Sequence, residues 1–311
     1  MLDSAIGVCE NCIGEIVAGA SGQRNLELWL RAILPFGGFV AAFSGRDGDL
    51  DSYFDESMEN QPLPLISVAG YLFERDAYAA YSEAMEALFD GRIEYFRASE
   101  CFHLTGEFAK YDRASQVPEE IERGVIALTR KYSVFGVGAA VSEARYNLLL
   151  PMLSETLMGT AYSMLCQWCL QAISNWAKEN PFKGEIVYNF EAGCKDQSDA
   201  NRDLNMIASK PDFSERARYG GHGFYPKRKF RGLQSADLFA YFCRREAEET
   251  GQILLGKFPK NRRRDFQALI GNTEEELKEI PHRFKFFDDE SMKRFFNQDD
   301  NSDPAMRWYN V

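Results

Sequence analysis

Two apolar runs of strand length, separated by a short polar turn, open the patterned part of this chain. Residues 50–57 and 63–72 form these runs, and residues 58–62 join them as a hairpin. Further on, segments with helical spacing alternate with strand-length runs. The helices are expected at 74–89, 118–131, 151–178, 196–208 and 234–249, and the strands at 132–141 and 185–190. A hairpin followed by alternating helices and strands predicts an α/β domain built on a mixed sheet.

The 311 residues divide into three regions by composition. Residues 1–48 contain a CxxC motif and several glycines, and we interpret them as an N-terminal extension of unassigned role. Residues 49–287 carry the α/β pattern and are long enough to bury a sizeable core. Residues 288–311 are rich in Asp and Asn, which is typical of a weakly ordered tail.

The charge of the chain is unevenly distributed. The total is -11, but residues 216–264 hold thirteen Lys or Arg against four Asp or Glu, a local charge of +9. An evenly acidic surface would repel phosphates, whereas a basic segment of this kind favours contact with nucleic acid.

Seven scattered cysteines and the absence of a secretory signal pattern are typical of a protein in a reducing compartment, so we expect a cytoplasmic location. No membrane association is expected. The longest uncharged apolar run, residues 32–43, is far shorter than the roughly 20 residues that span a bilayer.

Three carboxylates lie at the edges of predicted elements. Asp55, in Tyr-Phe-Asp-Glu-Ser, is at the end of a strand, Glu191 follows another strand, and Asp237, in Leu-Gln-Ser-Ala-Asp-Leu, is on the first turn of a helix. Phosphodiester hydrolysis by two divalent ions about 3.5 to 4 Å apart requires carboxylates that converge from separate elements. A simpler interpretation is open for each: a turn cap for Asp55, a solvated acid for Glu191, and a favourable helix-dipole interaction for Asp237.

Two of these motifs resemble a known family. The pair Asp55-Glu56 near the start and Gln234-x-x-Asp237 near the end are similar to the DE and QxxD motifs of the domain of unknown function 3800 family, over about residues 50–250. The resemblance implies a ribonuclease H-like fold and nuclease chemistry with Mg²⁺ or Mn²⁺. It implies metal-binding, catalytic roles for Asp55 and Asp237, and for Glu191 by strand order.

Other residues are assigned supporting roles. Arg97 stands where the resemblance predicts a histidine, and Glu100 is a candidate fourth acid for the metal. Glu56 follows Asp55 on a strand and should point to the opposite side, which suggests an indirect role. The Gln234 amide either hydrogen-bonds a ligand phosphate, holds the neighbouring acid in position, or caps the helix. His222, between two glycines, is either a proton shuttle or an ordinary loop histidine.

A basic cluster directly precedes the late motif. Lys227, Arg228, Lys229 and Arg231, with aromatic residues interleaved, are expected to contact a phosphate backbone. The alternative is a solvated charged loop.

The cysteines offer a different kind of site. Cys9 and Cys12 have metal-ligand spacing but no second pair nearby in the sequence. Cys166 and Cys169 fall within an apolar helical pattern and are expected to be buried packing residues.

The sequence thus favours a metal-dependent nuclease that acts on RNA or DNA. The rival is a catalytically silent nucleic-acid-binding protein of a defence or mobile-element system, in which the same acids only shape the fold. A thiol redox or zinc module built on Cys9 and Cys12 is the third hypothesis. The sequence does not indicate an oligomeric state.

Overall fold

The structure is a computed structural model of the whole chain. It describes residues 48–58, 64–152, 159–180, 182–251 and 282–287, together with Leu269 and Met292. Cys9, Cys12 and nearly all of both the proposed N-terminal extension and the proposed tail lie outside the described residues.

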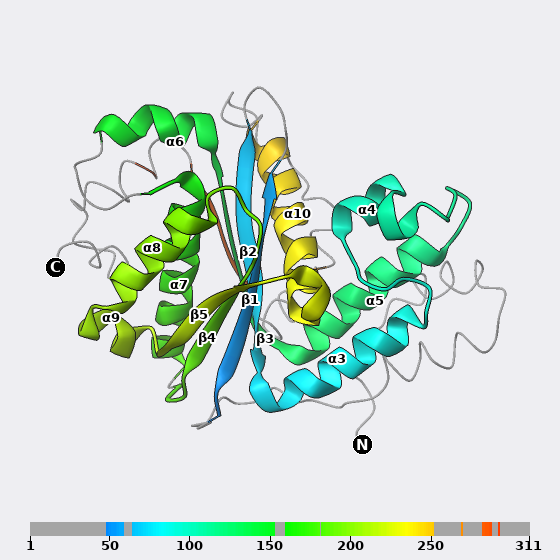
Figure 1. The fold of residues 1–311 in the computed structure, drawn as a ribbon, viewed down its shortest axis with the longest axis horizontal. Helices are drawn as coiled ribbons and strands as arrows, with labels where there is room; N and C mark the ends of the chain where they lie inside the picture. Colours follow the sequence, from blue (N-terminus) through cyan, green and yellow to red (C-terminus); the bar gives the residue numbers. More distant parts are fainter. Residues whose placement is uncertain are drawn as a thin grey trace, which may run out of the picture. The chain divides into compact units, whose positions relative to one another are not determined.

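A six-stranded mixed sheet forms the centre of the molecule, in the order β5-β4-β1-β2-β3-β6 (Figure 1). The strands are β1 (Leu50–Met58), β2 (Leu65–Glu74), β3 (Ser133–Ser142), β4 (Ile186–Glu191), β5 (Tyr219–Tyr225) and β6 (His282–Phe287). β1, β2 and β3 pair antiparallel, whereas β4 is parallel to β1, β5 to β4, and β6 to β3. An antiparallel meander continued by two parallel strands beside β1 is the ribonuclease H-like arrangement, so the expected fold class is confirmed.

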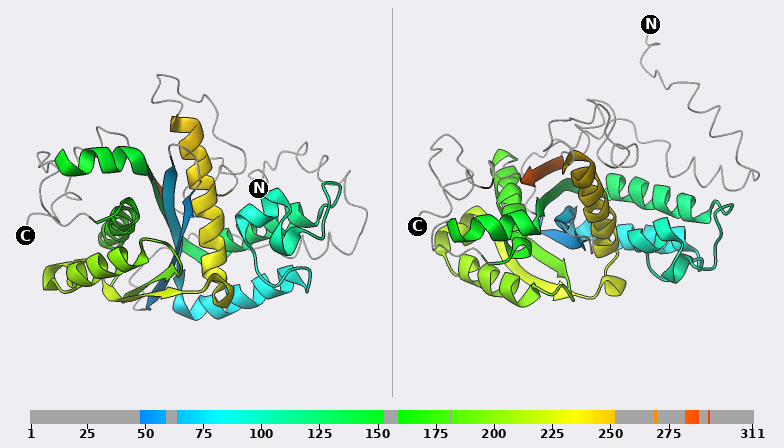
Figure 2. Two further views of the ribbon diagram at one scale, coloured as in Figure 1. Left: turned by 45° about the horizontal axis from the view of Figure 1, so that its top comes forward. Right: turned by 90° about the horizontal axis from the view of Figure 1, so that it is seen from above.

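Helices cover both faces of the sheet, as the views in Figures 1 and 2 show. One face carries α7 (Ala161–Glu179), α8 (Gln197–Ala208) and α9 (Pro211–Arg216). The opposite face carries α10 (Arg231–Gly251), α3 (Arg75–Phe89), α4 (Ala98–His103) and α5 (Val117–Tyr132). The remaining helical segments are α6 (Glu143–Leu149), η1 (Gly106–Phe108), η2 (Leu150–Met152) and η3 (Lys227–Lys229).

The two sheet faces bury separate hydrophobic clusters. Alternate residues of β1 supply both, since Phe54 packs on the α7 side and Tyr53 on the α10 side. Trp176 of α7 stacks on Phe135 with ring centres 5.3 Å apart, and Phe239 of α10 stacks on Tyr71 at 4.9 Å. Asp55, which follows Phe54, therefore belongs by alternation to the α10 side.

Most expected elements are present, with three differences. The long helix expected from residue 151 begins instead at Ala161, where the Thr160 hydroxyl accepts a hydrogen bond from the Ser163 amide. β5, which contains residues 220–223 and pairs along β4, is a strand where the sequence predicted none. β6 and the short helices α4, α6 and α9 were not expected.

The described part of the chain agrees with two further expectations. None of its helices is long and apolar enough to cross a membrane. Cys166 and Cys169 are fully buried within the α7-side core, as expected for packing residues.

Candidate metal centre

Two carboxylates meet at neighbouring ends of β1 and β4. The parallel register pairs Phe54 with Phe190, so Asp55 and Glu191, the next residues, lie side by side. Both preceding phenylalanines belong to the α7-side core, which directs the two acids to the α10 side of the sheet. The motif position of Asp55 and the strand-end position of Glu191 thus produce an adjacent pair.

α10 delivers a third carboxylate, Asp237, to this pair. The helix lies close to β1 at Gly232, where an added Cβ would be 2.4 Å from Tyr53 Cδ2. The hydroxyl of Ser67 on β2 donates a 2.7 Å hydrogen bond to the Ala240 carbonyl and ties the helix to the sheet. Glycine in the first turn therefore lets α10 approach closely enough for its acid to reach the strand ends.

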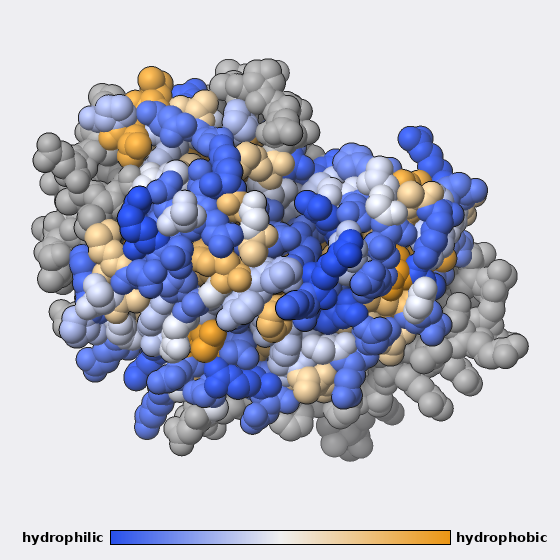
Figure 3. Space-filling model, in the orientation of Figure 1, coloured by the Kyte–Doolittle hydropathy of each residue, from blue (hydrophilic) through white to orange (hydrophobic). Residues whose placement is uncertain are grey.

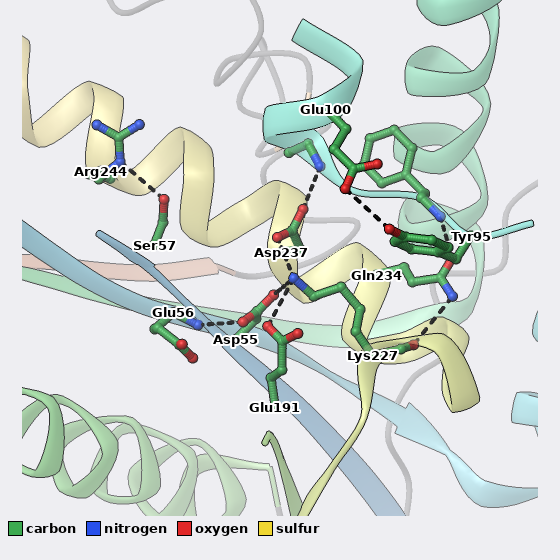
Figure 4. Close-up of polar contacts among 12 residues, drawn as sticks. Asp55, Glu56, Ser57, Tyr95, Glu100, Glu191, Lys227, Gln234, Asp237 and Arg244 are labelled. Atoms are coloured by element: carbon green, nitrogen blue, oxygen red, sulfur yellow. Dashed lines mark hydrogen bonds and ion pairs between the residues drawn. The ribbon is translucent and has the colours of Figure 1, made fainter. Parts of the chain in front are cut away.

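The ammonium group of Lys227 lies among the three acids (Figure 4). Its Nζ is 2.6 Å from Asp55 Oδ2, 2.9 Å from Glu191 Oε2 and 2.6 Å from Asp237 Oδ1. The Lys227 side chain is only 6% exposed and that of Asp55 is 0% exposed. Three carboxylates from two strands and a helix thus converge on one buried cation.

Burial and neighbouring opposite charges shift the pKa values of Asp55 and Lys227 in opposite directions. Burial raises the pKa of Asp55 well above its usual value, although Lys227 acts to lower it. Burial alone would lower the pKa of Lys227, but Asp237, Asp55 and Glu191 outweigh that effect and raise it. Lys227 is therefore a fixed positive charge that stabilises the ionised acids.

Asp237 and Gln234 also hold the segment that leads into α4. Oδ2 of Asp237 accepts a 2.5 Å hydrogen bond from the Ala98 amide, and Oε1 of Gln234 accepts one of 2.9 Å from the Phe96 amide. The Gln234 amide group also donates to the Lys227 carbonyl at 3.4 Å. Gln234 therefore positions the residues around the acids, and Asp237 satisfies a free N–H at the start of α4.

Glu56 lies nearer to the acids than strand alternation alone suggests. One oxygen each from Asp55, Glu56 and Glu191 can be chosen so that all three lie within 4.8 Å of one another. Glu56 Oε2 is buried and has no hydrogen-bond partner among the described residues. Burial, assisted by the charge of Glu191, raises the pKa of Glu56 to about 7. This group of oxygens is suited to a hard divalent cation.

Arg97 adds a second positive charge beside the acids. It directly precedes Ala98, whose amide is bound by Asp237, and its side chain is exposed. Partial burial lowers the pKa of Arg97, but the carboxylates of Asp237, Glu191 and Asp55 together raise it. The residue that departs from the resembled motif thus lies in the electrostatic field of the site.

Two predicted residues are placed elsewhere. Glu100 accepts hydrogen bonds from the Tyr95 hydroxyl at 3.1 Å and the Glu107 amide at 3.0 Å, so its carboxylate fixes the α4 loop. His222 contacts the Tyr219 hydroxyl and, at 3.0 Å, Asn201 Oδ1. Burial lowers the pKa of His222. Neither residue is among the three acids that contact Lys227.

The four residues of the basic cluster have different environments. Lys227 is buried, contrary to its expected contact with a phosphate backbone, because three carboxylates compensate its charge. Arg231 pairs with Glu86 and donates to the Glu94 carbonyl at 2.9 Å, which ties α10 to the α3 region. Arg228 and Lys229 are exposed, and the Arg228 guanidinium lies 4.5 Å from the centre of the Tyr95 ring.

The surface in this region is polar. Figure 3 shows strongly hydrophilic residues over α10 and beside α4. Arg97, Arg228 and Lys229 are exposed basic residues of the segments next to the acids. Exposed positive charges of this kind attract anionic ligands.

Comparison with known proteins yields a distant likeness. No protein-family model matches the chain, and no curated protein matches it. Among solved structures, the chain is similar to the crystal structure of Bst-RNase HIII in complex with Mn²⁺, at 15% identity and a TM-score of 0.32. The likeness covers 77% of this chain and 67% of that one.

Sequence reasoning missed two members of the site. Lys227 was assigned to the surface because it belongs to a run of basic residues, and no pattern in the sequence marks it as buried. Arg97 was noted only as a departure from the resembled motif. Its one sequence signal was its position three residues before Glu100, in the segment that the resemblance already covered.

Proposed function

We propose that this protein is a divalent-metal-dependent nuclease that hydrolyses phosphodiester bonds of RNA or DNA. The observation that carries the proposal is the convergence of Asp55, Glu191 and Asp237 on one cationic position, the ammonium of Lys227. Membership of the domain of unknown function 3800 family stays a prediction.

The residues present suit Mg²⁺ or Mn²⁺. Carboxylate oxygens are the ligands that these hard cations prefer, and Asp55, Glu56 and Glu191 supply them from adjacent strands. Glu56 Oε2 is buried without a hydrogen-bond partner among the described residues, and Asp55 Oδ2 is buried with the Lys227 ammonium 2.6 Å away. When bound, such an ion makes a water nucleophilic and stabilises the charge on the leaving oxygen.

The protein's own groups would bind and orient the substrate. Arg97, Arg228 and Lys229 are exposed near the acids and would pair with phosphates. Gln234 and Asp237 hold the segment before α4 through backbone hydrogen bonds, which fixes the position of Arg97 relative to the acids. Lys227 would keep the acids ionised and in place.

A second candidate function is binding of nucleic acid without cleavage. It is favoured by the fact that Lys227 already neutralises part of the acidic charge, so three of the acids have a cationic partner within the chain itself. In that case the acids would shape the fold and the exposed basic residues would carry the function.

Cleavage assays with an Asp55→Asn variant test the proposal. Chelator-treated full-length protein would be incubated with labelled single-stranded and duplex RNA and DNA, with and without Mn²⁺ or Mg²⁺. We expect metal-dependent cleavage by the wild type and a loss of about a thousand-fold in the variant, since metal stabilisation is worth several kcal/mol.

Asp51→Asn is the matched control, because Asp51 lies on the same strand but pairs with Arg75 at the opposite end. This control should keep its cleavage rate. Nucleic-acid binding that is independent of metal and of Asp55, with no cleavage of any substrate, would instead support the non-catalytic function.

A further inference from the structure

We propose that Lys227 permanently supplies one of the two positive charges at this centre, so that the protein binds a single divalent ion through Asp55, Glu56 and Glu191. The inference rests on the proposed metal-dependent function and specifies how that site is built. Lys227 would then be a positioning residue, whose ammonium holds Asp55, Glu191 and Asp237 at the place where a second metal ion would otherwise lie.

The position of the ammonium is the first argument. Nζ contacts one oxygen from each of Asp55, Glu191 and Asp237 at 2.6 to 2.9 Å. Asp237 contacts this ammonium but is not among the three acids whose oxygens group within 4.8 Å. Asp55 and Glu191 thus belong to both groups, whereas Asp237 contacts only the ammonium and Glu56 belongs only to the group suited to an ion.

Lys227 is also anchored through its backbone. Its carbonyl accepts hydrogen bonds from the Gln234 side chain at 3.4 Å and from the Phe230 amide at 3.3 Å. Pro226 precedes it and restricts the backbone at that point. These contacts fix the point from which the side chain extends, and withdrawing the ammonium would leave three carboxylates without their cation, which opposes replacement of the lysine by a metal ion.

The charge of the site is the third argument. With a metal bound and the carboxyl groups of Asp55, Glu56, Glu191 and Asp237 all ionised, the cations Lys227 and Arg97 leave a formal charge of -4 + 2 = -2 from these six side chains. One divalent ion balances the remaining negative charge. A second ion would make the centre positive before any phosphate arrives, and at the position of the Lys227 ammonium it would compete for the same oxygens of Asp55, Glu191 and Asp237.

A buried carboxylate oxygen without a hydrogen-bond partner indicates where the ion would bind. Glu56 Oε2 is buried without a hydrogen-bond partner in the described part of the chain, and Glu56 does not contact Lys227 in the ion pairs that hold the ammonium. Glu56 thus extends the acidic pair of Asp55 and Glu191 away from the lysine.

Counting bound ions tests the inference independently of activity. Chelator-treated full-length protein would be titrated with Mn²⁺, with heat measured by calorimetry and free Mn²⁺ by electron paramagnetic resonance. We expect one ion per chain in the wild type and two in Lys227→Met, in which the carboxylates lose their ammonium. Lys229→Met removes an exposed charge from the same short helix and should still bind one ion.

Two further variants locate the ion and do not require Lys227 to be changed. Glu56→Gln should abolish binding of the single ion or weaken it at least ten-fold, whereas Asp237→Asn should retain one ion. Circular dichroism would establish that each variant is folded. Loss of the ion in Asp237→Asn together with its retention in Glu56→Gln would overturn the assignment.

The other outcomes separate this inference from the proposed function. Two ions in the wild type, or one in folded Lys227→Met, would contradict the role of Lys227 and leave the metal-dependent function intact. Binding only after Lys227 is replaced would show that the ammonium excludes the metal and would also overturn the inference. No binding in any of these proteins would contradict the metal-dependent function itself.

Discussion

β1 carries a cluster of ion pairs near each of its ends, and the two clusters differ in burial. Near its start, Arg75 pairs with Asp49 at 2.6 Å and Asp51 at 3.1 Å, and the Arg75 side chain is 43% exposed. Near its end, Lys227 pairs with three acids at similar distances, yet its side chain is 6% exposed.

The difference in burial indicates which of the two clusters is suited to a catalytic site. Water solvates the Arg75 cluster, so each charge there is screened and the cluster costs little to form or to break. In the Lys227 cluster the charges have lost most of their water, and each depends on the others. A metal ion or a phosphate that enters the second cluster would interact strongly with it, because the surrounding protein screens charge weakly.

The two clusters are expected to differ most in the stability that the protein loses when the cation of each is removed. In the presence of chelator, Lys227→Met is expected to lower the free energy of unfolding by about 3 to 5 kcal/mol, since it leaves buried carboxylates without compensation. Arg75→Met should lower it by about 0 to 1 kcal/mol. Urea denaturation at neutral pH would measure both, and equal losses would show that the two clusters do not differ energetically.

A second comparison concerns side chains that accept hydrogen bonds from backbone amides near each cluster. The expected difference in stability is of intermediate size. Gln234→Leu would leave the buried Phe96 amide without its acceptor, at a cost of about 1 to 3 kcal/mol. At the exposed end, Asp49 accepts a 3.1 Å hydrogen bond from the Glu185 amide, and there water can replace the lost acceptor. Asp49→Ala should therefore destabilise less than Gln234→Leu by the same denaturation assay, and the reverse order would contradict the assigned difference in burial.

The sequence located the acids better than it located the cation. Asp55 and Asp237 lie at the end of a patterned strand and at the start of a patterned helix, and Glu191 at the end of another strand. Such positions follow from local periodicity, and the parallel register of β1 and β4 brings the strand ends together. Lys227 lies in a run of basic residues, a pattern that predicts an exposed segment. Its burial depends on three acids from separate elements of the chain.

The missed parts of the fold have a similar cause. β5 contains three glycines in seven residues, a composition unfavourable for a strand, and is stabilised by pairing with β4. α4 has six residues, too few to show helical periodicity, and the Asp237 carboxylate binds its first amide. In both elements, tertiary contacts determine a secondary structure that the local sequence alone does not predict.

The smallest difference between the two clusters is expected in how salt changes the destabilisation caused by removing each cation. At 1 M salt the screening length falls to about 3 Å, so exposed ion pairs weaken while buried ones are affected much less. We expect the small destabilisation caused by Arg75→Met to shrink by a few tenths of a kcal/mol between 0.05 and about 1 M KCl. The effect of Lys227→Met should change by a smaller fraction of its value, because its partners are 0 to 20% exposed. Parallel urea titrations at the two salt concentrations would measure this, and a proportional loss in both variants would show that solvent reaches the Lys227 cluster as freely as it reaches Arg75.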